Sequence, residues 1–584
     1  MWCKNCNIET NEDICPICGE ITVEDIPVEV YWCQECKIPV VQNVSQADRG
    51  ICPICGKQTK YMAADLRPVF PEERLLLELL LGKKPHGYIE KSVWSVNSRY
   101  YIDGESVAIS SKTFQNADTD YLVKEIEKYK YENSYEAFNK HISNFVLANK
   151  GRLNYLKDEA FEFVRKTASK FDEEKIVLSF SGGKDSTVTA DVVVKALSNP
   201  SLVHIFGNTT LEFPSTVAYA ERYRENHPQA IFLTAKNDEQ VFYDVCEDIG
   251  PPARMMRWCC SMFKTGPISR VINSLYRNEQ ILTFYGIRKS ESVSRSKYNR
   301  VEDDAESVKI QQQTVASPIF FWKDIDIWLY MLSENVDFND AYRFGYDRVG
   351  CWCCPNNSYW SEYLSNIYMN EQYTKFHNIL VDFAKQIGKP DPKEYVSSGG
   401  WKARQGGNGL NYSNNAILSF KPCVLEENAY NFELNKPITE TLYELFKPFG
   451  LLDFNIGNKR LGEVYVLGKK DKQPLLKLTG KVGQNLLKVS VLRETAIFCN
   501  PKINEMLIKN QITKFQTCIG CMACESVCKY NAINIRHNEM QKGEKFNISY
   551  TIDEKKCVGC LECVKHFSGG CYMKKVLRTK QGKE

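Results

Sequence analysis

Short runs of β-branched and aromatic residues alternate with helical stretches through the middle of the chain. We expect strands at 176–180, 202–207, 230–233 and 281–285, and apolar residues at helical spacing between them. Strands that alternate with helices are typical of a parallel sheet covered by helices. The pattern therefore predicts a central α/β domain, and ligands of such a sheet bind at the carboxyl ends of its strands.

The pattern is less regular on either side of this domain. Strand-like and helical stretches without a chemical motif precede it, and an α+β pattern follows it after a glycine- and asparagine-rich passage at 397–415, which we interpret as a linker. Cysteine pairs crowd both ends of the chain. The role of the two motif-free segments stays open. The predicted organisation is 1–60, 61–154, 155–396, 416–514 and 515–584.

The charge balance excludes a protein that binds polyanions or membranes through an overall excess of positive charge. Lys and Arg number 75 against 72 Asp and Glu, which gives a net charge of +3. The densest apolar run, at 75–81, contains Glu78 and is far too short to cross a bilayer. The start MWCKNC does not resemble a signal peptide. We expect a cytoplasmic protein without membrane contact. A nucleic-acid partner stays open, although no basic and aromatic interleaving supports one.

The chain has 24 cysteines, and most of them stand in CxxC or CC pairs. Disulfide scaffolds are usually short secreted chains with varied cysteine spacings. Repeated CxxC pairs in a long chain more often hold metal. We therefore expect metal sites rather than disulfides, in a reducing cell.

A glycine turn follows the strand at 176–180 and precedes a helical run. Gly182 and Gly183 let the backbone approach a ligand, and the N–H groups of the following helix favour an anion there. Lys184 adds a positive charge, while Asp185 and its neighbours can cap the helix or hold a metal, expected to be Mg²⁺. A plain helix cap is the alternative. The loop SGGKDST consists of Ser181, Gly182, Gly183, Lys184, Asp185, Ser186 and Thr187.

This loop lacks the spacing of a Walker motif and resembles the PP-loop of ATP pyrophosphatases. Five further stretches resemble the phosphoadenosine phosphosulfate reductase family. They are GNTTLEFPST at 207–216, RWCCSMFKTGPI at 257–268, GIRKSESVSR at 286–295, SPIFFWKDIDIW at 317–328 and GYDRVGCWCCP at 345–355. The resemblance implies a Rossmann-like sheet of the adenine nucleotide alpha hydrolase-like type.

By the same resemblance the ligand is an adenine nucleotide, either ATP or adenylyl sulfate. It implies that Asn208, Gly286, Arg288 and Arg295 bind the nucleotide together with the loop. Lys184, Asp185 and Arg288 are the expected catalytic residues. Forked or ammonium donors suit phosphate and sulfate oxygens, so Lys184, Arg288 and Arg295 are expected to contact them. Surface salt bridges are the alternative for the two arginines.

The resemblance also implies one [4Fe-4S] cluster beside the nucleotide, since the family joins a CC pair to a distant CxxC pair. Cys353 is an alternative ligand, and zinc or unligated buried thiols stay open. The expected ligands are Cys259, Cys260, Cys351 and Cys354.

The last cysteines follow the C-x2-C-x2-C-x3-C spacing and resemble a bacterial ferredoxin with two [4Fe-4S] clusters. In that arrangement the fourth cysteine of each run serves the other cluster. Lys529 replaces the usual proline, and the gap before Cys571 is longer than usual, which weakens the expectation for that ligand. Electron transfer with an external donor is implied, and a purely structural role is the alternative. The two runs are Cys518, Cys521, Cys524 and Cys528, then Cys557, Cys560, Cys563 and Cys571.

Two amino-terminal quartets, each ending in CPIC and glycine, resemble zinc ribbons. Closed four-cysteine zinc sites are structural rather than catalytic. Mononuclear iron is the alternative metal. The quartets are Cys3, Cys6, Cys15 and Cys18, then Cys33, Cys36, Cys52 and Cys55.

Two departures argue against a thioredoxin-dependent reductase of the resembled family. No ECG[IL]H motif, which carries the thiol nucleophile in such reductases, occurs in the sequence, and SGGKDS is intact as in enzymes that cleave ATP. We therefore favour an enzyme of sulfur metabolism that activates a substrate with ATP and transfers or reduces sulfur. One alternative is an adenylyl sulfate or phosphoadenylyl sulfate reductase supplied with electrons by its own ferredoxin domain. The other is a scaffold that senses nucleotide or transfers electrons without catalysis. The sulfur donor and acceptor are open.

Overall fold

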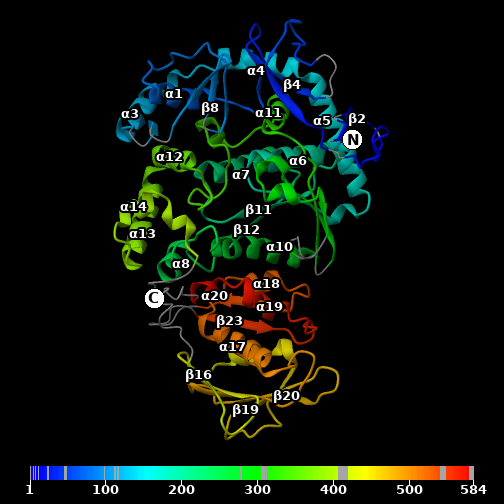
Figure 1. Ribbon diagram of the computed structural model, residues 1–584, viewed down its shortest axis with the longest axis vertical. Helices are drawn as coiled ribbons and strands as arrows, with labels where there is room; N and C mark the ends of the chain where they lie inside the picture. Colours follow the sequence, from blue (N-terminus) through cyan, green and yellow to red (C-terminus); the bar gives the residue numbers. More distant parts are fainter. Residues whose placement is uncertain are drawn as a thin grey trace.

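The computed structural model is elongated, with the amino-terminal part and residues 419–577 on opposite sides of the central α/β domain (Figure 1). No helix among the described residues has the length and apolarity to cross a membrane. The structure describes residues 2–577 except for 4, 7, 11, 23–24, 45–48, 98, 111–112, 115–116, 277–278, 304–309, 311, 406–418 and 539–546.

The central sheet has six strands in the order β12-β11-β10-β13-β15-β14. All neighbours are parallel except the short β14, which is antiparallel to β15. The predicted parallel α/β domain is confirmed, and two strands were not predicted. The strands are β10 (Ile176–Phe180), β11 (Val203–Asn208), β12 (Ile231–Lys236), β13 (Ile281–Phe284), β14 (Val301–Glu302) and β15 (Gln313–Ala316).

Helices cover both faces of this sheet. α6 (Lys184–Leu197) and α7 (Pro214–Asn226) lie on one side and α10 (Gly266–Tyr276) on the other (Figure 1). The strand order reverses between β10 and β13, which is where open α/β sheets form ligand crevices. Further helices are α5 (Lys150–Ala168), α8 (Phe242–Ile249), α9 (Trp258–Cys260), α11 (Asp324–Ser333), α12 (Tyr359–Tyr368), α13 (Asn370–Gln386) and α14 (Pro392–Ser397).

The segment expected at 61–154 packs against the central domain through one continuous core. The buried ring of Phe70 contacts Trp328 and Phe338 of the central domain, with both centroids 5.3 Å away. The expected boundary at 154 lies inside α5. The elements of this segment are β6 (Arg67–Pro68), α1 (Pro71–Leu80), β7 (Val93–Val96), β8 (Arg99–Ile102), β9 (Glu105–Ala108), α3 (Thr119–Tyr129) and α4 (Glu136–Ala148).

The amino-terminal residues form two small β units around the cysteine quartets. The first is β1 (Trp2–Cys3) with β2 (Ile8–Glu9), and the second has the order β4-β3-β5. Its strands are β3 (Val28–Cys33), β4 (Ile38–Asn43) and β5 (Lys60–Ala63), so the expected boundary at 60 lies inside β5.

The interpretation of 397–415 as a linker is wrong for the first residues of that passage. Trp401, Lys402 and Arg404 are buried, and Lys402 pairs with Glu362 at 2.7 Å. Trp401 and Arg404 pack on rings of α13, and this packing outweighs the turn-forming composition. Positions 406–415 of that passage lie outside the described residues.

An antiparallel sheet and the last cysteine-rich residues share a second core. α17 (Pro501–Thr517) packs against both, so the expected boundary at 514 lies inside a helix. The sheet order is β16-β17-β21-β20-β19-β18, from β16 (Ser419–Pro422), β17 (Ala429–Glu433), β18 (Leu451–Asp453), β19 (Glu463–Leu467), β20 (Pro474–Thr479) and β21 (Leu486–Val491), with α16 (Glu440–Glu444) beside it. The cysteine-rich part contains α18 (Ala523–Ser526), β22 (Ile533–His537), β23 (Ile548–Ile552), α19 (Glu562–Gly569) and α20 (Tyr572–Leu577).

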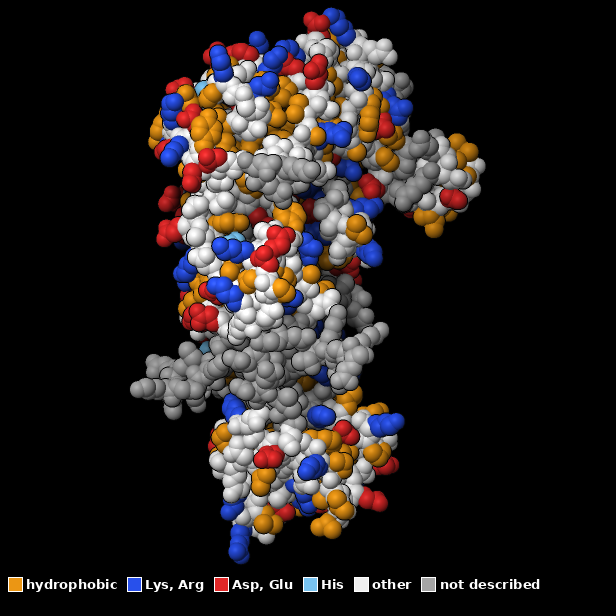
Figure 2. All heavy atoms as spheres, turned by 60° about the vertical axis from the view of Figure 1, so that its left-hand side comes forward, with side chains coloured by type: hydrophobic (Ala, Val, Ile, Leu, Met, Phe, Trp, Pro, Cys, Tyr) orange, Lys and Arg blue, Asp and Glu red, His pale blue; other side chains and the backbone are white. Residues whose placement is uncertain are grey.

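The face shown in Figure 2 has no large area of only positive or only negative side chains. Lys and Arg side chains are interspersed with Asp and Glu over it. This agrees with the near-balanced composition.

Candidate functional site

The glycine turn after β10 is held closed by its own side chains. Gly182 has φ 69°, and a Cβ there would lie 2.8 Å from the side chain of Thr216. Ser186 Oγ accepts from the Ser181 amide at 3.1 Å and donates to the Gly183 carbonyl at 2.8 Å. A Cβ on Gly286 would lie 2.5 Å from the Asp185 carbonyl carbon. The backbone is therefore shaped for close contact, and only glycine fits at 182 and 286.

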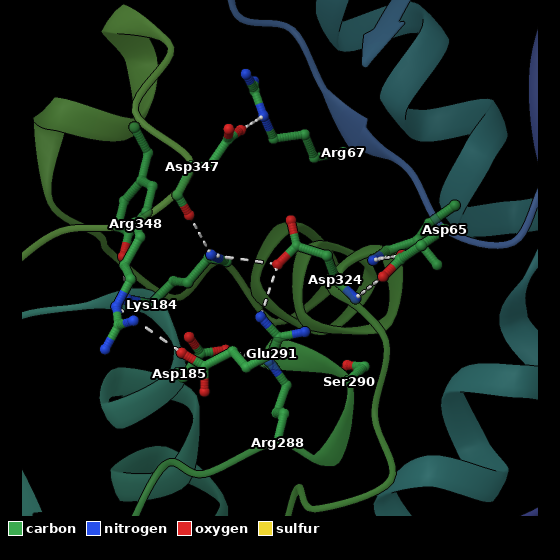
Figure 3. A network of polar contacts seen from close by, with 12 residues as sticks. Asp65, Arg67, Lys184, Asp185, Arg288, Ser290, Glu291, Asp324, Asp347 and Arg348 are labelled. Atoms are coloured by element: carbon green, nitrogen blue, oxygen red, sulfur yellow. Dashed lines mark hydrogen bonds and ion pairs between the residues drawn. The ribbon is translucent and has the colours of Figure 1, made fainter. Parts of the chain in front are cut away.

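Buried charges converge on this turn (Figure 3). Lys184 Nζ lies 3.2 Å from Asp324 and donates to the Asp347 carbonyl at 2.7 Å. Arg288 pairs with Asp185 at 2.6 Å and with Asp324 at 2.9 Å. Lys184 and Arg288 are 3% and 5% exposed. The two predicted cations and the predicted carboxylate thus meet in one network.

Mutual pairing keeps these groups charged. Burial works against the charge of Asp185, but Arg288 and Lys184 outweigh it and hold its pKa below the usual range. Burial likewise opposes the charge of Arg288, whereas Asp185 and Asp324 raise its pKa. A compact set of fixed positive charges at a helix N-terminus is suited to phosphate oxygens.

The other predicted nucleotide residues lie at the edge of this network. Arg295 pairs with Glu291, and burial together with the nearby Arg348 lowers its pKa to about 10. Asn208 ends β11, and its side chain accepts from the Thr210 amide at 2.9 Å. Their role in binding stays a prediction.

Sequence reasoning missed three acidic partners. Asp324 stands within the quoted SPIFFWKDIDIW stretch, so the stretch itself was a signal. Asp65 accepts from the Asp324 and Ile325 amides at 2.9 and 3.0 Å, and Asp347 pairs with the buried Arg67. No local pattern marks Asp65, because it comes from a separate segment of the chain.

The loop that carries Cys351 packs directly on the glycine turn after β10. Tyr342 OH accepts from the Lys184 amide at 2.9 Å, and Asp347, four positions before Cys351, accepts from its ammonium. Cys351 in turn forms a β-bridge with Glu212 and lies 3.4 Å from Thr209 Oγ1. The glycine turn and the central cysteines are therefore neighbours.

The predicted central ligands lie close enough to influence one another. Cys259 interacts with Cys260, Cys351 and Cys353, and Cys354 interacts with Cys260. The alternative ligand Cys353 is 6% exposed and interacts with Cys351, Cys246 and Cys354. A set of four thiols suits an iron-sulfur cluster. The choice between Cys353 and Cys354 as the fourth ligand stays a prediction.

The amino-terminal quartets have the spacing of mononuclear sites. In each quartet all four sulfur atoms lie within 4.8 Å of one another, and Cys3–Cys18 and Cys33–Cys55 are both 3.5 Å apart. Tetrahedral zinc with bonds of about 2.3 Å places sulfurs about 3.8 Å apart. Backbone amides help form thiolates, because those of Glu20 and Lys57 lower the pKa values of Cys18 and Cys55 to about 7. Both quartets could hold zinc.

The last eight cysteines lie near one another in two groups. Cys521 interacts with Cys571, Cys524 and Cys518. Cys528, Cys557, Cys560 and Cys563 line one cavity, and Cys560 is exposed at the surface. Sets of four thiols fit [4Fe-4S] clusters, and the pairing of Cys571 with the first three cysteines and of Cys528 with the second three stays a prediction.

Comparisons with known proteins identify two parts of the chain. Residues 175–357 match the family of the phosphoadenosine phosphosulfate reductase domain, and residues 517–566 match the 4Fe-4S dicluster domain. Both agree with the resemblances in the sequence. The chain therefore carries these two domains.

Relatives cover only parts of the chain. Two uncharacterized proteins of Methanocaldococcus jannaschii are 32% and 28% identical over 46% and 45% of this chain, which spans 54% and 61% of their lengths. The adenosine 5'-phosphosulfate reductase of Staphylococcus epidermidis is 24% identical over 32% of this chain and 72% of its own. Phosphoadenylyl-sulfate reductase from Candida auris, solved as a phosphate complex, is 17% identical with a TM-score of 0.27 and covers 35% of this chain and 95% of its own.

Proposed function

We propose that this chain, with its phosphoadenosine phosphosulfate reductase domain and its 4Fe-4S dicluster domain, activates a substrate with ATP and introduces sulfur into it. In the first step a substrate oxygen attacks the α-phosphorus of ATP, the bond between the α- and β-phosphates breaks, and pyrophosphate leaves. In the second step a sulfur nucleophile replaces AMP on the activated substrate. The identity of the substrate and of the sulfur donor is not part of the proposal.

The contact between the Lys184 turn and the Cys351 loop carries this proposal. One short segment, from Tyr342 to Cys351, both holds the PP-loop lysine and supplies a predicted cluster ligand. A nucleotide on the turn therefore meets the central cysteines at its reactive end. The intact SGGKDS loop favours ATP over a sulfonucleotide.

Lys184 of the turn and the adjacent Arg288 bind the phosphate oxygens of the nucleotide in this proposal. Lys184 and Arg288 are paired with Asp324 and Asp185, so an incoming phosphate competes with a carboxylate for each cation. The network holds the cations in place before the nucleotide arrives, which avoids reorganisation when pyrophosphate charge develops. Asp185 and Asp324 are then available to hold Mg²⁺.

The dicluster part lies against the central cysteines. Ser261, next to Cys260, donates to Tyr572 OH at 3.2 Å, and Tyr572 follows Cys571. Tyr572 interacts with Cys521 on one side and with Cys260 on the other. Arg270 and Glu525 close the same interface at 3.0 Å. Iron-sulfur groups at these positions supply one-electron chemistry when bound.

Pyrophosphate release tests the proposal. Anaerobically purified protein is given labelled ATP, with total cellular RNA and a deproteinised small-molecule extract as separate sources of acceptor, and in parallel adenylyl sulfate or its 3'-phosphorylated form. We expect pyrophosphate from ATP and about a hundredfold loss in Lys184→Ala, the size typical of losing one donor to a developing anion. Lys195→Ala, exposed on the same helix α6, is the matched control and retains the rate.

The alternatives give different results. Sulfite from a sulfonucleotide without pyrophosphate from ATP would identify a reductase supplied by its own ferredoxin domain. Neither product from protein with its full iron content would favour the scaffold.

A further inference from the structure

A lysine from α17 lies in the interior of the dicluster part. Lys514 is 3% exposed, and its Nζ donates to Tyr550 OH on β23 at 2.9 Å. The same ammonium lies 4.5 Å from the centroid of the Tyr550 ring, and Tyr550 is itself 2% exposed. Bulk water therefore does not solvate this charge.

The neighbours of Lys514 are the cysteines of both runs. Its side chain interacts with Cys524 and Cys518 of the first run and with Cys563 of the second, and its carbonyl accepts from the Cys518 amide at 2.9 Å. Tyr550 interacts with the same three thiols. The ammonium therefore lies between the two predicted cluster sites, at the point where the two cysteine sets meet.

No carboxylate within the described residues lies at ion-pair distance from Lys514. The other buried lysines differ in this respect: Lys184 pairs with Asp324 and Lys402 with Glu362. An unpaired buried ammonium is strongly unfavourable, so a buried cation needs anions beside it. For Lys514 the available anions are cysteine thiolates.

We propose that Lys514 is the fixed counter-charge of the dicluster centre and raises the reduction potential of its clusters. This rests on the electron-supplying part of the proposed function, but on no assumption about the nucleotide. A four-thiolate [4Fe-4S] site becomes more negative by one charge when it accepts an electron. A positive charge held close to it in a weakly screening interior favours the reduced form.

The position of Lys514 makes the effect common to both sites. Its charge interacts with thiols of the first and the second set, so it stabilises an added electron on either one. The first set adjoins Tyr572 and the central cysteines, whereas Cys560 of the second set is exposed. A single charge thus raises the reduction potential of both sites, the one with the exposed Cys560 and the one beside the central cysteines.

Potentiometric titration followed by electron paramagnetic resonance tests this role. Lys514→Met removes the charge and keeps an apolar chain of similar length. We expect the equilibrium constant for one-electron reduction to fall at least tenfold, which equals a midpoint shift of about 59 mV to lower potential. Lys509→Met, exposed on the same helix, is the matched control and leaves the potential unchanged.

Two further variants separate the charge from the hydrogen bond and from folding. Tyr550→Phe removes the hydroxyl but keeps the ammonium, so its shift should stay below threefold. Lys514→Arg keeps the charge and should stay near wild type. Equal potentials in wild type and Lys514→Met, or a Tyr550→Phe shift as large as that of Lys514→Met, would overturn the proposal.

Iron analysis covers the case in which the neutral variant does not assemble. Loss of iron from both Lys514→Met and Lys514→Gln, with retention in Lys514→Arg, would assign the lysine to assembly and count against a tuning role. The titration contains no nucleotide. Its failure is therefore distinguishable from failure of ATP cleavage, which leaves these potentials unaffected.

Discussion

Removing the charge of Asp65 should change how the stability of the α11 start depends on pH. Burial and the nearby Asp324 raise the pKa of this carboxyl from 3.8 to about 6. The difference of roughly 2 pKa units corresponds to about 3 kcal/mol in favour of the protonated folded form. The folded protein thus binds a proton more tightly than the unfolded chain.

The sign follows from linkage. A raised folded-state pKa contributes stability that is complete below the unfolded value of 3.8 and is lost as pH rises through about 6. Asp65→Asn keeps an oxygen that can accept from the Asp324 or Ile325 amide but carries no charge. We expect the variant to gain on wild type as pH rises from 5 to 8, by about 1.4 kcal/mol, because roughly half of the total is already lost between pH 3.8 and 5.

Thermal unfolding by circular dichroism from pH 5 to 8, together with hydrogen exchange at the Asp324 and Ile325 amides, measures the difference. Asp118→Asn is the control, because Asp118 caps α3 at 3.1 Å from the Tyr121 amide and is exposed. Parallel pH curves for Asp65→Asn and wild type would refute the reasoning.

Two further predictions concern the metal sites. Cys36→Ser should reduce the zinc content from two ions to one per chain, because a closed quartet needs four thiolates, and the iron content should stay unchanged. Iron in these sites, or an unaltered zinc content, would contradict the assignment of zinc ribbons. Cys354→Ser should abolish the spectroscopic signal of the central cluster and Cys353→Ser should retain it, because the resembled family joins its CC pair to a CxxC pair and Cys351 and Cys354 have that spacing. The signal is read by iron content and electron paramagnetic resonance, and the reverse pattern would identify Cys353 as the ligand.

The sequence predicted the elements that carry their own periodicity. β10 and β13 lie within a residue of the expected strands, and the glycine turn opens α6 as expected. β15 was missed because QTVA is short and half polar. The two amino-terminal quartets were predictable from the spacing of their CxxC pairs, and their sulfur atoms do lie together.

Residues that act across distant segments could not be predicted in this way. Asp65 and Lys514 have no motif, and their significance comes from the groups that folding brings beside them. Asp65 is about 260 positions from the amides it caps. A buried charge is recognisable only when its partners are known.

The segment around Asp65 and Arg67 gains a role from these contacts. Arg67 pairs with Glu73 at 2.6 Å and also with Asp347, whose carbonyl holds Lys184. Asp65 fixes the start of α11, where Asp324 bridges Lys184 and Arg288. Two independent links therefore run from this segment to the two cations of the nucleotide turn. Because each cation is buried, loss of either link leaves a charge without its fixed partner, so the segment belongs to the nucleotide site rather than to a separate scaffold.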